Sequence, residues 1–138
     1  MPQFAKEQVA ADPHAVALVD PHRKLTWAEV DDALNRCANR ILGADLGEQR
    51  RVAVFAENAA ETALAHLGAL LGGASSVPVN FHLTSDEAAY ILEDSDTRIL
   101  FVGPETAERG LAAAQHAGVG QIVGWGDPVP GIQDWDEW

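Results

Sequence analysis

The stretch from Arg51 to Leu92 alternates short apolar runs with helical patterns, and this alternation constrains the fold more than any other part of the chain. Val52–Phe55 and Ser76–Val79 have the length and composition of buried strands, and further strands are predicted at Arg98–Val102 and Gln121–Val123. Strands that alternate with helices of this length form right-handed crossovers and a parallel sheet. The predicted fold class is therefore α/β, a doubly wound, mainly parallel sheet with flanking helices.

Three helix starts can be located from their N-terminal residues. Thr26 with Glu29, and Thr84 with Glu87, each have the spacing of a capping box, in which a hydroxyl and a carboxylate satisfy free amides reciprocally. Asn58 follows the first core strand and is predicted to cap the next helix, because its side chain can accept a hydrogen bond from a free amide.

The chain is predicted to consist of one α/β unit over residues 1–124 and a tail over residues 125–138 that leads into chain absent from this sequence. Ahead of the alternating region we expect a helix at Phe4–Ala11 and two short strands, Ala15–Val19 and Lys24–Leu25. The tail, WGDPVPGIQDWDEW, holds three of the four tryptophans. Two alternatives remain open for these rings: they pack on the edge of the unit itself, or they dock on the absent chain.

The composition excludes several classes of function. The net charge of -12 argues against a nucleic-acid surface, which requires basic patches. Cys37 is the only cysteine, so no internal disulfide can form, as is typical of a reducing compartment. The N-terminal residues do not resemble a signal peptide, and no apolar run reaches the length of a membrane span. We therefore expect a cytoplasmic protein with neither a nucleic-acid partner nor a membrane span.

The usual nucleotide-binding patterns are absent from the sequence. Neither the dinucleotide fingerprint GxGxxG nor a Walker loop occurs in the required context, and the two lysines, Lys6 and Lys24, lie outside any glycine-rich loop. In a doubly wound sheet, ligands bind at the carboxyl ends of the strands. Glu57, Asn58 and the loop of Asn80, Phe81 and His82 are the polar groups predicted to lie there.

Three segments carry a resemblance to a known family. They read LTWAEVDDALNRCANRIL, RVAVFAENAAETALAHLGALLGGASSVPVN and FHLTSDEAAYILEDSDTRILFV. In order and spacing they resemble the N-terminal part of the AMP-forming acyl-CoA synthetases, over residues 14 to about 120. The segment VPVNFHLT resembles the corresponding segment of bacterial fatty-acyl or aryl-CoA ligases. Of these two classes we expect a bacterial fatty-acyl-CoA ligase.

The resemblance implies an activity for the parent enzyme. Such ligases use ATP and magnesium to convert a carboxylic acid to an acyl-adenylate, release pyrophosphate, and transfer the acyl group to coenzyme A. The family's phosphate loop, ribose-binding aspartate and mobile lysine have no counterpart in residues 1–138. The resemblance therefore implies an N-terminal fragment that is a structural part of the ligase's large N-terminal domain and is inactive alone. Its expected partners are the rest of the ligase chain and a small carboxylic acid, with a homodimer also possible.

One set of site residues follows from the resemblance. In related ligases the loop after the second core strand and an arginine after the third help to hold the CoA nucleotide, which implies such a position for Asn80, Phe81, His82 and Arg109. The family's glycines in that loop are replaced here by Asn80, Phe81 and His82. The alternative that the residues leave open is a stand-alone, non-catalytic α/β interaction module.

Overall fold

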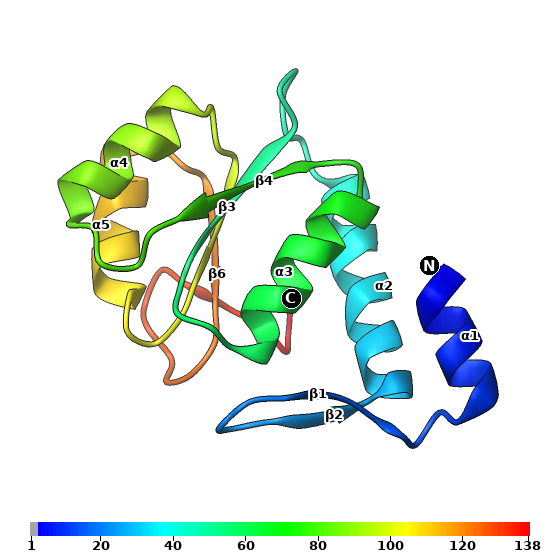
Figure 1. Ribbon diagram of the computed structural model, residues 1–138. Helices are drawn as coiled ribbons and strands as arrows, with labels where there is room; N and C mark the ends of the chain where they lie inside the picture. The colour runs from blue at the N-terminus through cyan, green and yellow to red at the C-terminus, as the bar shows by residue number, and fades with distance from the viewer. Residues whose placement is uncertain (1–2) are drawn as a thin grey trace.

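The computed structural model describes residues 3–138, which form a three-layer α/β structure around a five-stranded parallel sheet (Figure 1). The strand order is β4-β3-β5-β6-β7, and every neighbouring pair is parallel. The strands are β3 (Arg51–Phe55), β4 (Ser75–Val79), β5 (Ile99–Val102), β6 (Gln121–Gly124) and β7 (Gln133–Asp134). This arrangement confirms the predicted fold class.

Two helical layers cover the sheet, one on each face (Figure 1). Side chains alternate between the faces along each strand, so Val54 and Phe101 point toward one layer, whereas Phe55 and Val102 point toward the other. The first layer contains α2 (Trp27–Gly43) and α3 (Ala60–Leu71), and the second contains α4 (Ser85–Asp94) and α5 (Ala107–Ala117). Each layer therefore buries its own apolar cluster against one side of the sheet.

The N-terminal part adds a helix and a hairpin on the α2 side. Helix α1 (Gln3–Ala11) packs on α2, and β1 (Val16–Val19) pairs antiparallel with β2 (Lys24–Thr26) in a separate two-stranded sheet. Residues 1 and 2, which the predicted unit included, lie outside the described residues. None of the helices in residues 3–138 is both long and apolar enough to cross a membrane.

The capping predictions have different outcomes. The boxes of Thr26 with Glu29 and of Thr84 with Glu87 are both present, so these two predictions are confirmed. The prediction that Asn58 caps the next helix is wrong, because α3 starts at Ala60 and no side chain of its own segment caps it. The carboxylate of Asp20, in the turn between β1 and β2, accepts a hydrogen bond from the Ala60 amide at 2.7 Å instead.

The tail returns to the sheet. Its residues Gln133 and Asp134 form β7, which pairs with β6 and is absent from the sequence-based prediction. Trp135 and Trp138 are buried, and their rings lie edge-on to Phe101 with centroids 5.8 and 5.3 Å away. Trp125 is only partly buried but packs against the same cluster, so all three tail tryptophans pack on this protein's own core.

A glycine permits the close packing of α2 against α3. A Cβ at Gly68 would lie 2.4 Å from Cys37 Sγ and 2.6 Å from Cys37 Cβ. These distances are below van der Waals contact, so α2 and α3 can approach this closely only because position 68 has no side chain.

Candidate functional site

A cleft lies where the direction of the chain crossovers changes. Helix α3 connects β3 to β4 on one face, whereas α4 connects β4 to β5 on the other, so β3 and β5 are the switch point of the sheet. The cleft of about 600 Å³ is lined by segments that follow β3, β5 and β6, together with the β1–β2 turn and the tail. In doubly wound sheets this is the usual place for a ligand.

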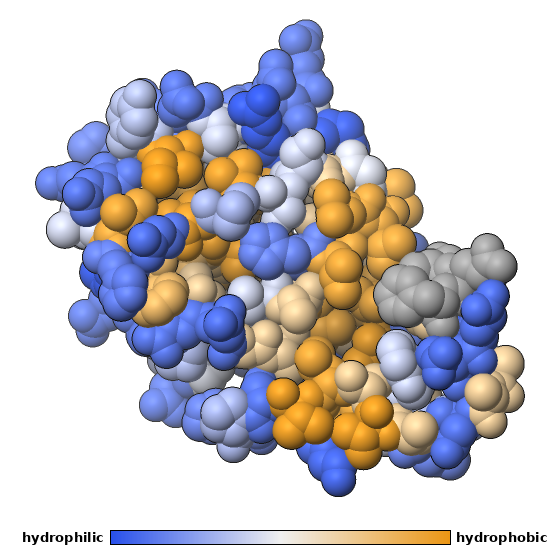
Figure 2. All heavy atoms as spheres, in the orientation of Figure 1, coloured by the Kyte–Doolittle hydropathy of each residue, from blue (hydrophilic) through white to orange (hydrophobic). Residues whose placement is uncertain are grey.

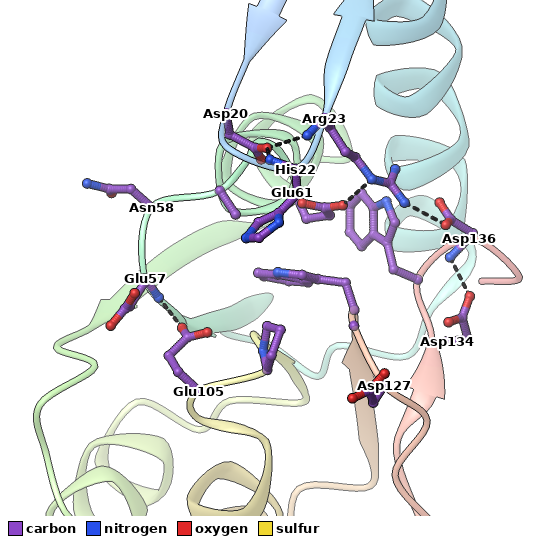
Figure 3. A pocket seen from close by; sticks show the side chains of 15 residues that line it. Asp20, His22, Arg23, Glu57, Asn58, Glu61, Glu105, Asp127, Asp134 and Asp136 are labelled. Atoms are coloured by element: carbon purple, nitrogen blue, oxygen red, sulfur yellow. Dashed lines mark hydrogen bonds and ion pairs between the residues drawn. The ribbon is translucent and has the colours of Figure 1, made fainter.

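Carboxylates dominate the lining of the cleft (Figure 3). One arginine, Arg23, and one histidine, His22, are the basic residues among the lining side chains. With seven carboxylates and one guanidinium, the lining has a formal charge of -6 when His22 is neutral. The carboxylates are those of Asp20, Glu57, Glu61, Glu105, Asp127, Asp134 and Asp136.

Arg23 joins three parts of the chain at the edge of the cleft. From the β1–β2 hairpin, its Nε lies 2.7 Å from Oε1 of Glu61 in the first turn of α3, and its Nη2 lies 2.6 Å from Oδ2 of Asp136 in the tail (Figure 3). The Glu61 side chain is 5% exposed, so this guanidinium compensates an otherwise buried charge. The hydrogen bond to Asp136 and the charge of Glu61 raise the pKa of Arg23.

Asp20 satisfies the N-terminal end of α3. Besides the Ala60 amide, it accepts hydrogen bonds from the backbone amides of His22, at 2.7 Å, and Arg23. The bond from the Ala60 amide is the main cause of the lowered pKa of Asp20. The turn of the hairpin is thus fixed against the start of α3.

A second carboxylate accepts a hydrogen bond from a backbone amide at this edge of the sheet. Glu105, which follows β5, accepts a hydrogen bond from the backbone amide of Glu57, which follows β3 (Figure 3). The amides of Glu57 and Ala60 are two of the donors that an anionic ligand could use at the end of β3 and the start of α3. The protein's own carboxylates occupy these two donors, and the lining has a formal charge of -6, so the cleft disfavours a phosphate group.

The described residues hold no preformed cluster of protein ligands for a magnesium ion. No group of three or more histidine, cysteine, aspartate or glutamate side chains within residues 3–138 has a metal-binding arrangement. Four of the seven carboxylates, those of Asp20, Glu61, Glu105 and Asp136, are engaged with backbone amides or with Arg23. We therefore derive no reaction step through ATP or magnesium at this cleft.

The predicted site residues fall into two groups. Glu57 and Asn58 line the cleft, but the loop of Asn80, Phe81 and His82 lies outside it, after β4. Arg109, near the start of α5, contacts that loop: Nη1 donates to the carbonyl of Phe81 at 2.8 Å and to the carbonyl of Leu83. Arg109 and the loop, far apart in the sequence, are therefore neighbours in space.

Arg109 is held from several directions. Its Nη2 donates to the Glu105 carbonyl at 3.2 Å, and its guanidinium lies 5.3 Å from the centroid of the Phe55 ring. Because three of its N–H donors bond to backbone carbonyls, Arg109 fixes the position of the loop. Any role of this region toward CoA remains a prediction.

The loop after β4 carries polar and aromatic side chains next to each other. The Asn80 side chain accepts a hydrogen bond from the His82 amide at 3.0 Å, which closes an Asx turn. The rings of Phe81 and His82 lie 4.1 Å apart, and Asn80 and His82 are exposed.

Sequence reasoning missed the cluster of Asp20, Arg23 and Glu61. One signal was available, because Glu61 lies three and four residues before Leu64 and Ala65, which are buried. A carboxylate on the buried stripe of a helix needs a cationic partner. The sequence does not show which cation supplies it, since Arg23 lies on a different element.

Comparison with known proteins identifies relatives among adenylate-forming enzymes. The chain is 30% identical over 122 residues to a 4-hydroxybenzoate–CoA/benzoate–CoA ligase of Rhodopseudomonas palustris, covering 86% of this chain and 22% of the ligase. It is 28% identical over 123 residues to the long-chain-fatty-acid–CoA ligase FadD13 of Mycobacterium tuberculosis, covering 87% and 24%. It is 34% identical over 98 residues to tyrocidine synthase 3 of Brevibacillus parabrevis, covering 71% and 2%. The chain thus spans about a quarter or less of the length of these relatives.

A solved structure has the same architecture. The anthranilate CoA ligase AuaEII, determined in complex with anthranoyl-AMP, superposes with a TM-score of 0.78 and 25% identity, covering 98% of this chain and 26% of the ligase. The sequence profile of one family, described as AMP-binding enzyme, matches residues 5–134. The chain therefore belongs to the AMP-binding enzyme family.

Proposed function

We propose that this chain is the first α/β unit of an ATP-dependent acyl-CoA ligase. Such an enzyme converts a carboxylic acid, ATP and CoA to acyl-CoA, AMP and pyrophosphate through an acyl-adenylate. The observation that carries the proposal is the family match over residues 5–134. The superposition on a ligase bound to an acyl-AMP supports the same reaction type.

Within that enzyme, residues 1–138 supply structure and the rest of the chain supplies the chemistry. Adenylation needs cations and free amides around the phosphates. The cleft at the switch point is lined by seven carboxylates, two of which occupy the backbone amides of Glu57 and Ala60. ATP and magnesium therefore bind to residues beyond this unit, the 138 residues alone are inactive, and residues 125–138 lead into the following chain.

The acid substrate is a fatty acid, with an aromatic acid as the competing class. The relation to FadD13, named for long-chain fatty acids, supports the first class. The relation to a ligase named for benzoate supports the second. We place the enzyme in the cytoplasm, since a single cysteine, buried as Cys37, is typical of a reducing compartment.

The loop of Asn80, Phe81 and His82 borders the CoA nucleotide, and Arg109 acts through the loop. The exposed Asn80 and His82 side chains provide polar contacts, and the paired Phe81 and His82 rings provide a stacking surface. Because Arg109 holds the carbonyls of Phe81 and Leu83, its replacement displaces the loop. In the whole enzyme, Arg109→Met is expected to raise the KM for CoA and leave the KM for ATP unchanged.

An activity assay tests the proposal. The complete product of the native gene is incubated with ATP, magnesium and either palmitate or benzoate, and pyrophosphate release is measured with and without CoA. The expected result is acid-dependent release, faster with palmitate, and CoA-dependent formation of acyl-CoA; the 138-residue chain shows none. Absence of acid-dependent release from the complete product with a panel of fatty and aromatic acids would contradict the proposal.

A second candidate is a unit of a synthase that uses an acceptor other than free CoA. The 34% identity to tyrocidine synthase 3 favours it. The same assay separates the two candidates, because such a synthase would release pyrophosphate with an acid but form no acyl-CoA when CoA is added.

A further inference from the structure

Thr106 is a buried threonine that does not cap the helix it precedes. It stands at the N-cap position of α5, as Thr26 and Thr84 do at α2 and α4, but only those two use the hydroxyl on their own helix. Thr106 is 0% exposed, and its Oγ1 donates to the carbonyl of Phe55, the last residue of β3. A threonine at an N-cap normally caps its own helix, so this hydroxyl serves a contact between two elements instead.

Glu105 adds a second contact to the same end of β3. Its carboxylate accepts the hydrogen bond from the Glu57 amide (Figure 3). The pairing of β3 with β5 ends at Phe55 and Val102, so the side chains of Glu105 and Thr106 continue the hydrogen bonding beyond the last paired residues. We call Glu105 and Thr106 the β3 clamp.

Gly103 allows the β3 clamp to form. A Cβ at this position would lie 2.7 Å from both carboxylate oxygens of Glu105 and would displace them. The Gly103 amide also donates to Thr106 Oγ1 at 3.2 Å. The Thr106 hydroxyl therefore both donates and accepts in a buried position, and its loss would deprive the Phe55 carbonyl and the Gly103 amide of this partner.

The β3 clamp is connected to the loop after β4 through Arg109. This residue lies three positions after Thr106, in the first turn of α5. Its guanidinium donates to the carbonyl of Glu105 in the clamp and to the carbonyls of Phe81 and Leu83 in the loop. The position of the loop thus depends on Arg109, and the position of Arg109 depends on the clamp that fixes the start of α5.

Arg109 supplies the directional contacts that the loop has with the rest of the molecule. The amides of His82 and Leu83 bond to the side chain and the carbonyl of Asn80, both within the loop. Phe81 and Leu83 also pack, partly buried, against the apolar cluster of the α4–α5 layer. Within residues 3–138, Arg109 is the one residue outside positions 80–83 that donates hydrogen bonds to this loop.

Resting on the proposed function, we propose that Thr106 is a positioning residue for the binding of CoA. Its hydroxyl bonds to β3 and to its own turn and does not bond to the loop. It fixes the start of α5, which places Arg109, and Arg109 places the loop. One turn, residues 103–106, therefore holds both the carboxyl end of β3 and the loop after β4.

The isosteric variant Thr106→Val tests this proposal in the complete gene product. It removes the hydroxyl and retains the shape of the side chain. We expect the KM for CoA to rise roughly 10-fold, because the loop is displaced from its binding position. The KM for ATP and the rate of acid-dependent pyrophosphate release without CoA should not change. Thr106→Ser keeps the hydroxyl and should have the wild-type KM for CoA.

Thr97→Val is the matched control. Thr97 is 4% exposed, and its hydroxyl lies 2.8 Å from Ser95 Oγ, but it precedes β5 whereas Thr106 follows it. This variant also loses a buried hydrogen bond, so its stability should fall while its KM for CoA stays at the wild-type value. An equal rise of the KM for CoA in both valine variants would overturn the proposal, because general destabilisation would then explain the effect.

A double variant tests whether Thr106 acts through Arg109. Thr106→Val combined with Arg109→Met should raise the KM for CoA no more than Arg109→Met does alone, because both changes release the same loop. Fold-changes that multiply would show two independent effects and would remove Thr106 from this role.

Hydrogen exchange of the loop provides a readout that does not require ligase activity. In Thr106→Val we expect the amides of residues 80–83 to exchange at least ~3-fold faster than in wild type or in Thr97→Val. Glu105→Ala, which changes an exposed side chain of the clamp and leaves the core intact, should accelerate the same amides by a smaller factor. Unchanged exchange in both clamp variants would overturn the proposal.

The two readouts separate this inference from the proposed function. A complete product that forms acyl-CoA, with an unchanged KM for CoA in Thr106→Val, refutes this inference alone. Faster loop exchange in a product without acid-dependent pyrophosphate release refutes the proposed function alone and keeps Thr106 as the residue that positions the loop.

Discussion

The two helical layers bury their inner faces in similar ways but differ in their outer faces. The α4–α5 layer has a mostly polar outer face, with Tyr90 as its one large exposed hydrophobic residue among those described. The α2–α3 layer exposes Leu42, Leu67, Leu70 and Leu71, and it also carries the hairpin and the chain terminus. The outer faces of the two layers therefore differ in polarity, although both inner faces pack on the same sheet, and in Figure 2 the hydrophobic colour gathers over α3.

The contacts that fix the site are also on the α2–α3 side. Arg23 and Asp20 connect the hairpin to the first turn of α3. By contrast, Arg109 connects α5 to the loop after β4, to the Glu105 carbonyl and to the Phe55 ring. If the comparison is right, changes on the α2–α3 side should affect the whole fold more than matched changes elsewhere.

The largest effect is expected from adding a methyl group where α2 and α3 are in close contact. Gly68→Ala places a methyl group 2.4 Å from Cys37 Sγ, so the helices must separate, at a cost of about 1–3 kcal/mol of unfolding free energy. Urea denaturation measures the change. Gly43→Ala is the matched control, because a Cβ there meets no atom within 4 Å. A Gly68→Ala protein as stable as wild type would show that the two helices are not closely locked.

Breaking the Arg23–Glu61 pair is the second test. Arg23→Leu leaves the Glu61 carboxylate buried without a cation, and we expect a loss of about 1–3 kcal/mol, below that of a fully buried pair because Arg23 is one-third exposed. Arg23→Leu combined with Glu61→Leu should recover part of the loss, as urea denaturation can show. The control Arg98→Leu removes a half-exposed pair with Asp96 and should change stability by less than ~0.5 kcal/mol. Equal effects of Arg23→Leu and Arg98→Leu would contradict the account.

The third test concerns the start of α3. Asp20→Ala removes the acceptor for the Ala60 amide and should cost about 1 kcal/mol at neutral pH, whereas Asn58→Ala should cost little. Because the folded pKa of Asp20 is lowered, its contribution is complete above pH 3.8 and disappears as the pH falls through the folded value. Thermal unfolding between pH 7 and pH 2.5 should therefore show a smaller loss below pH 3.8 in Asp20→Ala than in wild type. A larger cost for Asn58→Ala would restore Asn58 as the cap.

The smallest effect is expected at His66, on α3, whose Nδ1 lies 2.6 Å from Ser76 Oγ. Burial lowers the pKa of His66 below 6.5, so its contribution to stability is complete above pH 6.5 and decreases as the pH falls through the folded pKa. The melting temperature of His66→Gln should therefore decrease less than that of wild type between pH 7.5 and pH 5. His116→Gln, exposed on α5, should leave the decrease unchanged. If the melting temperature of His66→Gln decreased as much as that of wild type, groups other than His66 would account for the pH dependence.

The sheet and both capping boxes could be predicted because their signals are local. Runs such as Val52–Phe55 identify a strand by themselves, and Thr84 with Glu87 forms its box within one helical turn. β7 could not be predicted, since two residues between proline-rich and tryptophan-rich segments carry no strand pattern.

The site was less predictable because its contacts are not local. The cap of α3 comes from Asp20, and Arg23 reaches Asp136 near the other end of the chain. Such pairings depend on tertiary structure, and spacing in the sequence does not encode them. The sequence did indicate the edge of the sheet where Glu57 and Asn58 lie, because alternating strands and helices form a parallel sheet whose carboxyl ends share one edge.

The central claim is that these 138 residues are one unit of a longer adenylating ligase. The most direct test is the mass of the native gene product in its own cells, measured by intact-protein mass spectrometry after capture with an antibody against residues 1–138. We predict a product several times larger than 14.7 kDa, with its phosphate-binding residues downstream of Trp138. A native product of 14.7 kDa would contradict the claim and assign the protein to the stand-alone interaction modules.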